Sequence, residues 1–185
     1  GRKKIINLKL KNTTKHFRSI LFLKKEKEVR FFIDKYLDNN STFIDIGANI
    51  GTFSLYAAVK KNALVYAFEP EYSNLSILKE TIINSNLNKN IKPYSIAIGD
   101  KDRLTNLHIT NLMPGSAMSM ISDSNIEKVE NKLKVIWKEG VMELTLDKVC
   151  NDLNLSPSMI KIDTDGNEPN VLIGGNQVLK SDKLK

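Results

Sequence analysis

The sequence has few of the residues that build disulfides, metal centres and membrane spans. It contains one cysteine, Cys150, and two histidines among 185 residues. A single cysteine excludes an internal disulfide framework and a zinc site made only of cysteines. No apolar run approaches the roughly 18–20 residues of a membrane-spanning helix. The start, GRKKIINLKLKN, lacks the sustained apolar core of a secretory signal, so we expect a cytoplasmic protein.

Positive charge is concentrated at the N-terminal end of the chain. Residues 1–30 contain 11 Lys or Arg and 2 Glu, so the net charge of +7 leaves −2 for the other residues. We interpret residues 1–25 as a basic N-terminal arm and residues 26–185 as one domain, large enough to bury a core. Because the body is nearly neutral, we do not expect nucleic acid as a partner. We interpret the arm as a solvated leader, and contact with nucleic acid or an anionic membrane is the alternative.

Short apolar runs alternate with segments of helical periodicity. Buried strands are expected at residues 42–47, 63–69, 91–99 and 157–163, and helices at 29–37, 52–60, 72–86, 146–153 and 168–179. Residues 103–110 and 132–146 read as extended chain, and residues 111–122 read as a loop. This order predicts an α/β fold: a doubly wound, mostly parallel, Rossmann-like sheet with helices on both faces.

A glycine-containing turn follows the first predicted strand. In DIGANIG, Gly47 and Gly51 permit a tight turn, and the next helix offers N–H groups and the positive end of its dipole. Eighteen residues after Gly51, Glu69 ends the second strand, where a carboxylate can accept hydrogen bonds from ribose hydroxyls. The polar segments DIGANIG, EPEYSN and DTDGNE all follow strands, and ligands bind beyond the carboxyl ends of parallel strands. The sequence therefore predicts a nucleoside-binding site.

The spacing of the glycines favours S-adenosyl-L-methionine over a dinucleotide. Aligned on Gly47, the dinucleotide fingerprint G-x-G-x-x-G requires glycine where this chain has Asn49 and Thr52. A methionyl sulfonium carries no phosphate and needs an acceptor for its ammonium group, which Asp45 could supply. A dehydrogenase is a distant alternative, and a tight turn with no ligand is another.

Four segments in a fixed order carry a resemblance to a known family: FIDIGANIGTFSLYAA, VYAFEPEYSNLSILKETI, ELTLDKV and MIKIDTDGNEPNVLIGG. With them, residues 42–175 resemble the FkbM family of S-adenosylmethionine-dependent methyltransferases. The resemblance implies a class I methyltransferase fold and methyl transfer, typically to a hydroxyl or carboxyl of a glycan or small metabolite. It also implies that the cofactor contacts Asp45, Gly47, Ala48, Asn49, Gly51, Glu69, Pro70, Ser95, Ile96 and Ala97.

Two departures from the family pattern bear on these expectations. The family usually has D-V-E-G-x-E where this chain reads DTDGNE, so the carboxylate of Asp165 is shorter than the usual Glu. The family's fold also continues with strands beyond the point reached at Lys185, so we expect the sequence to be a fragment.

Catalysis is expected from Lys161, Asp163 and Glu168, which match charged positions of the last family segment. Asp163, at the end of a buried strand, is the candidate general base, and Lys161 lies two residues earlier on the same face. Acidic residues here can also chelate a divalent cation, with helix capping as the alternative, and we predict no metal.

Other reaction classes have less support in the sequence. No (Asp/Asn)-Pro-Pro-(Tyr/Phe) run is present, which argues against an enzyme that methylates amino groups of nucleic acids. Cys150 has no preceding proline, which argues against cysteine-nucleophile chemistry. Two alternatives stay open: an RNA or protein methyltransferase that uses the basic arm, and a non-catalytic fragment that keeps the cofactor turn.

Overall fold

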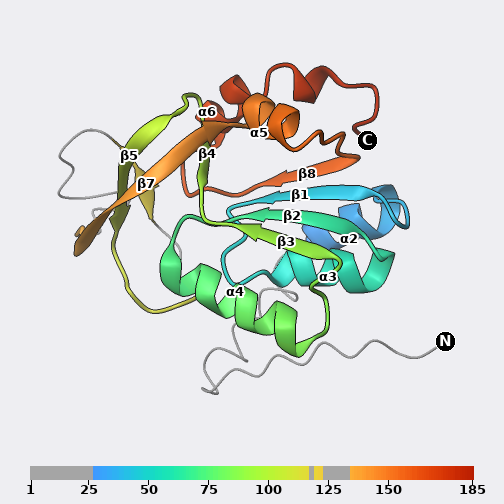
Figure 1. The fold of residues 1–185 in the computed structure, drawn as a ribbon, viewed down its shortest axis with the longest axis horizontal. Coiled ribbons are helices and arrows are strands. Elements are labelled where there is room, and N and C mark those ends of the chain that lie inside the picture. The colour runs from blue at the N-terminus through green and yellow to red at the C-terminus, as the bar shows by residue number, and fades with distance from the viewer. Residues whose placement is uncertain (1–26, 117–118, 123–133) are drawn as a thin grey trace.

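The computed structural model describes residues 27–116, 119–122 and 134–185 (Figure 1). The basic arm expected at residues 1–25 lies outside these ranges, as does part of the segment expected to be extended at residues 132–146. Among the helices described, none is both long and apolar enough for a membrane crossing.

A four-stranded parallel sheet forms the centre of the fold, with strand order β3-β2-β1-β8. The strands span Ile91–Tyr94, Leu64–Phe68, Thr42–Ile46 and Met159–Ile162, respectively. In the register, Asp45 of β1 lies opposite both Ala67 of β2 and Lys161 of β8. The carboxyl ends of β1, β2 and β8 therefore meet at one edge, which places the turn at Gly47 near Glu69 and Asp163.

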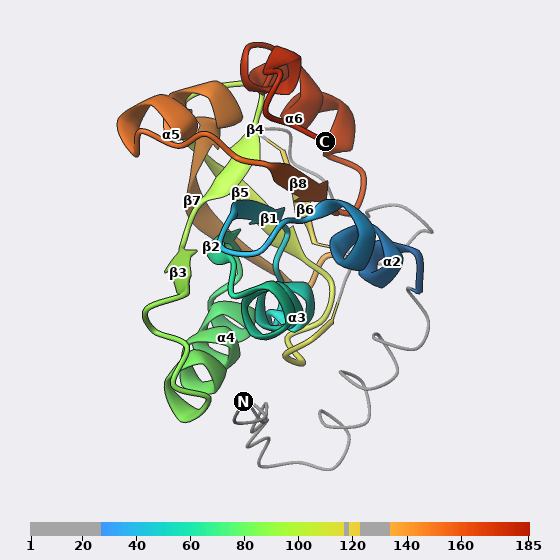
Figure 2. The ribbon, with the colours of Figure 1, turned by 90° about the vertical axis from the view of Figure 1, so that its right-hand side faces the viewer.

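Both faces of this sheet are covered by helices, as the predicted doubly wound fold requires (Figures 1 and 2). Phe43 and Val65 belong to a core cluster with residues from α2 (Lys27–Tyr36), α3 (Thr52–Lys61) and α4 (Tyr72–Asn84). Their neighbours Ile44 and Tyr66 belong to a second cluster, with residues from α5 (Leu146–Asp152) and α6 (Glu168–Gly174). Successive strand residues point to opposite faces, so a strand covered on both sides reads as a continuous apolar run.

A second four-stranded sheet has the order β4-β7-β5-β6. Its strands span Ala97–Gly99, Trp137–Thr145, Arg103–Ile109 and Met120–Ile121, respectively. β4 and β7 are parallel, whereas β5 is antiparallel to both β6 and β7. Figure 1 shows β5 and β7 as long neighbouring strands at the side of the parallel sheet.

The prediction of one strand over residues 91–99 is wrong, because the segment divides between the two sheets. β3 is an edge strand whose pairing ends where Glu69 N donates to Tyr94 O at 3.1 Å. Ser95 is exposed, and the chain then enters β4, where Ala97 and Ile98 are buried and paired with β7. A mostly apolar run with two exposed residues, Lys92 and Ser95, does not reveal a change of partner strand, because either sheet buries its apolar side chains.

The last predicted helix is shorter than residues 168–179. α6 ends at Gly174, and a separate 3-10 turn follows at Val178–Lys180. Gly174 also packs closely, since a Cβ there would lie 2.0 Å from the carbonyl oxygen of Gly99. The loop predicted over residues 111–122 contains the short strand β6.

Candidate active site

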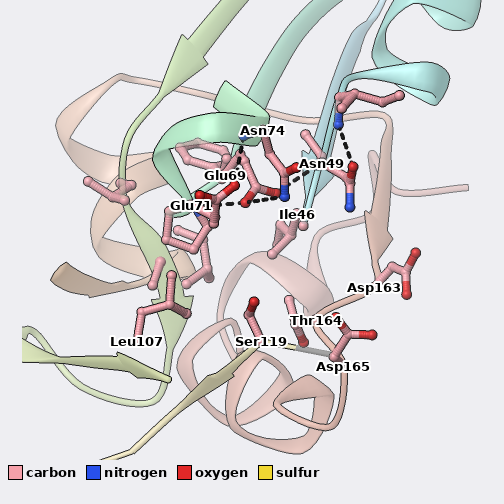
Figure 3. A pocket seen from close by; sticks show the side chains of 18 of the residues that line it. Ile46, Asn49, Glu69, Glu71, Asn74, Leu107, Ser119, Asp163, Thr164 and Asp165 are labelled. Atoms are coloured by element: carbon pink, nitrogen blue, oxygen red, sulfur yellow. Dashed lines mark hydrogen bonds between the residues drawn. The ribbon is translucent and has the colours of Figure 1, made fainter. Parts of the chain in front are cut away.

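A cavity of about 290 Å³ opens at the carboxyl edge of the parallel sheet. It is bordered by the ends of β1, β2 and β8, the start of α3, and residues that follow β3 and β5. Figure 3 shows Asn49, Glu69 and Asn74 gathered on one side, with Asp163, Thr164 and Asp165 on the other. A cavity beyond the carboxyl ends of parallel strands is where α/β sheets bind ligands.

Gly47 begins the turn between β1 and α3 and lies directly against the segment that follows β8. Its φ of +70° is in the left-handed region, and a Cβ at this position would lie 1.8 Å from the carbonyl oxygen of Asp163. Any side chain at position 47 would therefore displace the backbone of residue 163. Glycine is required here by both backbone conformation and space.

The N–H groups of the turn are used within the protein. Gly47 N and Ala48 N both donate to Phe68 O at 3.0 Å, and Gly51 N donates to Ala48 O at 2.8 Å. The start of α3 differs, because its N-cap Gly51 has no capping side chain and its first turn has no acidic residue. Thr52 and Phe53, the first residues of α3, line the cavity. The positive end of the α3 dipole therefore faces the cavity and favours a negatively charged ligand group.

Glu69 follows β2 and is 5% exposed. Its Oε2 accepts a hydrogen bond from Asn49 N at 2.7 Å, and its Oε1 accepts from Glu71 N at 3.0 Å and from Asn74 Nδ2 at 3.5 Å. Burial raises the pKa of Glu69 to about 7, although these hydrogen bonds act in the opposite direction. A carboxylate has about four acceptor positions, so Glu69 can still accept from a ligand hydroxyl.

The raised pKa of Glu69 predicts a specific dependence of stability on pH. The ordinary value is 4.5 and the folded value is about 7, so the folded state binds more protons between these limits. The free energy of unfolding should therefore decrease as the pH rises through this window, by about 3 kcal/mol for this group. Glu69→Gln removes this contribution. In urea unfolding from pH 4.5 to 8, wild type should lose stability relative to Glu69→Gln; parallel curves would contradict the prediction.

Lys161 connects β8 to the turn after β1. Its Nζ lies 3.1 Å from Asp45 Oδ1 and 3.5 Å from Asp163 Oδ2, and it donates to Gly47 O at 3.0 Å. Burial lowers the pKa of Lys161, but Asp45 and Asp163 together raise it above its ordinary value, so it remains protonated. Asp45 itself is fully buried and also accepts from Ser54 Oγ at 2.7 Å. Asp45 therefore acts on the cavity through Lys161 and does not border it.

Glu168 stabilises the loop that carries Asp163. Its Oε1 accepts from Thr164 N at 2.7 Å, and its Oε2 accepts from Gly166 N at 3.0 Å. Burial raises the pKa of Glu168, but these bonds lower it more, so the net shift is downward. Within the described ranges, no three His, Cys, Asp or Glu side chains are grouped so as to hold a metal ion. Glu168 is the acidic residue in the first turn of α6, but the N–H groups that it binds precede the helix, whose N-cap Asn167 makes no side-chain cap hydrogen bond.

The structure brings together most of the residues proposed from the sequence. The lining of the cavity includes Gly47, Ala48, Asn49, Glu69, Pro70, Ile96, Ala97, Lys161 and Asp163. Four proposed residues lie outside this lining: Asp45, Gly51, Ser95 and Glu168. Ser95 is exposed, and Gly51, with a φ of +87°, packs against Leu78. His108, one of the two histidines of the sequence and not a proposed site residue, lies outside the lining as well. Its Nε2 is 3.1 Å from Ser122 O.

On one wall of the cavity, the sequence analysis proposed no individual residue. The lining residues that it did not propose include Glu71, Asn74, Leu107, Gly115, Ser116, Ser119 and Ile121. Glu71 caps α4 by accepting from Ser73 N and Asn74 N, and an acidic residue between a strand and a helix is a local signal for this role. Gly115 and Ser116 reach the cavity through contacts across 41 and 67 residues, which local patterns do not encode.

The chain is thus an α/β protein with a cavity at the carboxyl edge of its parallel sheet. Residues 45–185 match the methyltransferase FkbM domain, so the chain belongs to this family of methyltransferases. It is 24% identical over 169 residues to "Methyltransferase 1" of Beauveria bassiana (strain ARSEF 2860), with 83% of this chain covered. The chain spans 66% of the length of that relative.

Solved structures of methyltransferases show a more distant likeness. Precorrin-6y C5,15-methyltransferase from Geobacter metallireducens GS-15 is 14% identical with a TM-score of 0.48, covering 85% of this chain and 58% of its own. TYW2 of P. horikoshii in complex with MeSAdo is 26% identical with a TM-score of 0.35, covering 38% of this chain and 26% of its own. The family assignment rests on the match over residues 45–185, and these similarities add nothing to it.

Proposed function

We propose that the protein uses S-adenosyl-L-methionine to methylate an oxygen, on a hydroxyl or carboxyl group of a glycan or small metabolite. The observation that carries this proposal is the placement of Glu69 and the uncapped start of α3 on one cavity. Glu69 suits the ribose hydroxyls, and the α3 terminus suits the methionyl carboxylate. The bound cofactor would supply an electrophilic methyl group for in-line displacement.

The residues of the chain then have distinct parts in the reaction. The cavity walls hold the acceptor in line with the methyl group and exclude water, which supplies much of the acceleration of such a transfer. Asp163, half-exposed and on the cavity, takes the proton from an acceptor hydroxyl as the new bond forms. Lys161 fixes the carboxylate of Asp163 relative to the turn at Gly47.

Calorimetric titration with S-adenosylhomocysteine tests the cofactor assignment. At pH 8, where wild-type Glu69 is ionised, Glu69→Gln should weaken the affinity by about 5- to 150-fold, because a ribose hydroxyl loses a charge-assisted hydrogen bond. Glu80→Gln, an exposed change on α4, is the matched control and should bind as wild type does. Normal binding by Glu69→Gln would refute the ribose assignment. NADH binding in place of S-adenosylhomocysteine would instead identify a dehydrogenase.

A further inference from the structure

The loop of residues 111–116 forms part of the cavity wall and has a defined internal structure. Ser116 N donates to Met113 O at 2.9 Å, and Ser116 Oγ donates to Asn111 O at 2.8 Å. Gly115 is buried and has a φ of +83°. Gly115 and Ser116 both line the cavity. The 111–116 loop is therefore folded on itself and directed toward the site.

Two asparagines connect this loop to the cofactor side of the cavity. Asn74 Oδ1 accepts from Gly115 N at 2.7 Å, and this bond is buried. Asn49 Nδ2 donates to Ser116 O at 2.9 Å. Asn74 belongs to the first turn of α4, and Asn49 to the turn after β1. Two consecutive residues of the loop are thus bound by two separate elements, α4 and the turn after β1.

The same two asparagines hold the carboxylate of Glu69. Asn49 N donates to Oε2 at 2.7 Å, and Asn74 Nδ2 lies at the long distance of 3.5 Å from Oε1 (Figure 3). Each asparagine therefore contacts Glu69 with one group and the 111–116 loop with another.

We propose that Asn49 and Asn74 are positioning residues that couple cofactor binding at Glu69 to the 111–116 loop. A cofactor that fixes Glu69 also fixes the backbone N–H of Asn49 and the side-chain amide of Asn74, and the side chains of these two residues hold Ser116 and Gly115 in the cavity wall. The acceptor then meets a formed wall only after the cofactor has bound. This inference rests on the proposed function, because it takes the ligand at Glu69 to be an adenosyl cofactor.

The identity of the two residues fits this role. Asn49 has a φ of +52°, a conformation that asparagine tolerates better than most residues. Asn74 is 5% exposed, and its amide supplies an acceptor to Gly115 and a donor to Glu69. An aspartate at position 74 would accept from Gly115 but would have no N–H to donate to Glu69. The two contacts of Asn74 can therefore be separated by mutation.

Hydrogen exchange with and without saturating S-adenosylhomocysteine tests the coupling. In wild type, the ligand should slow exchange of the amides in residues 111–116 by about tenfold or more, because the Gly115 N–H is one of the bonds being fixed. Asn49→Gly keeps the backbone N–H to Glu69 and deletes the contact to Ser116, so the ligand-induced slowing should fall by about three- to tenfold. Thr81→Val removes another buried polar group of α4 and should leave the slowing unchanged.

A second measurement separates positioning from a purely structural role. Asn74→Asp places a second carboxyl group beside Glu69, so the pH midpoint for S-adenosylhomocysteine binding should rise by about one unit. Ligand binding that leaves loop exchange unchanged in wild type would overturn the coupling while the proposed function stands. An unchanged midpoint in Asn74→Asp would also overturn it. A folded wild-type protein that binds no S-adenosylhomocysteine would refute both.

Discussion

Asp163→Asn should lower the rate of methyl transfer by about 10²- to 10⁴-fold, the usual contribution of a general base. Asp163 follows β8, where its N–H donates to Ile46 O at 3.1 Å, so its backbone is fixed by the sheet. Its side chain is 53% exposed and lies 3.5 Å from Lys161 Nζ. Asparagine keeps the size of the side chain and removes its ability to take a proton. The affinity for S-adenosylhomocysteine should therefore change little.

The measurement is transfer of tritiated methyl from S-adenosylmethionine to a pool of glycans and small metabolites, with calorimetry for ligand affinity. Asp152→Asn is a matched control, because Asp152 is 54% exposed and pairs with Lys148 at 2.8 Å on α5, away from the cavity. That control should transfer at the wild-type rate. If Asp163→Asn also did so, Asp163 would not be the base. If Asp163→Asn lost affinity in proportion to rate, it would be a binding residue.

Lys161→Met should lower the free energy of unfolding by about 3–5 kcal/mol, the cost of leaving one member of a buried ion pair alone. The side chain of Lys161 is 11% exposed and that of Asp45 is 1% exposed. Methionine fills similar space but cannot neutralise Asp45, which would keep only the hydrogen bond from Ser54. The contact from Lys161 Nζ to Gly47 O would also be lost, so cofactor affinity should decrease as well.

Urea unfolding at pH 7 measures the stability change, and two further variants make the result specific. Lys148→Met breaks an exposed ion pair of the same type, so its loss should be much smaller. The double variant Lys161→Met with Asp45→Asn removes the buried charge and should recover much of the stability. A double variant no more stable than Lys161→Met would show that the loss has another cause.

Much of the parallel sheet could be predicted because its strands are buried on both faces. Phe43 and Ile44 belong to cores on opposite sides of β1, and the strand is apolar at Phe43, Ile44 and Ile46. The turn at Gly47 and the acid at Glu69 were also predictable, since each directly follows a strand. The division of residues 91–99 between β3 and β4 was not, because it depends on pairing with Glu143–Thr145.

The candidate site was predictable only where residues that follow the parallel strands form it. Three of its residues, Glu69, Asn49 and Asp163, follow strands. The order of these strands in the sheet brings the residues to one edge. Their detailed roles depend on distant contacts. The carboxylate of Asp45 is bound by Ser54 and Lys161, and Asn74 accepts a hydrogen bond from Gly115, 41 positions later in the chain. Side-chain pairing across such separations leaves no periodic signal in one sequence.

The approach of Gly47 to Asp163 limits how the proposed acceptor preference could be changed. The carbonyl oxygen of residue 163 occupies the space that a Cβ of residue 47 would need, at 1.8 Å. The two loops are therefore in direct contact, and a larger residue at position 47 would displace the backbone at residue 163. Changes of acceptor preference should instead begin at Ser119 and Ile121. These residues line the cavity at β6 of the second sheet and take no part in the contact between Gly47 and Asp163.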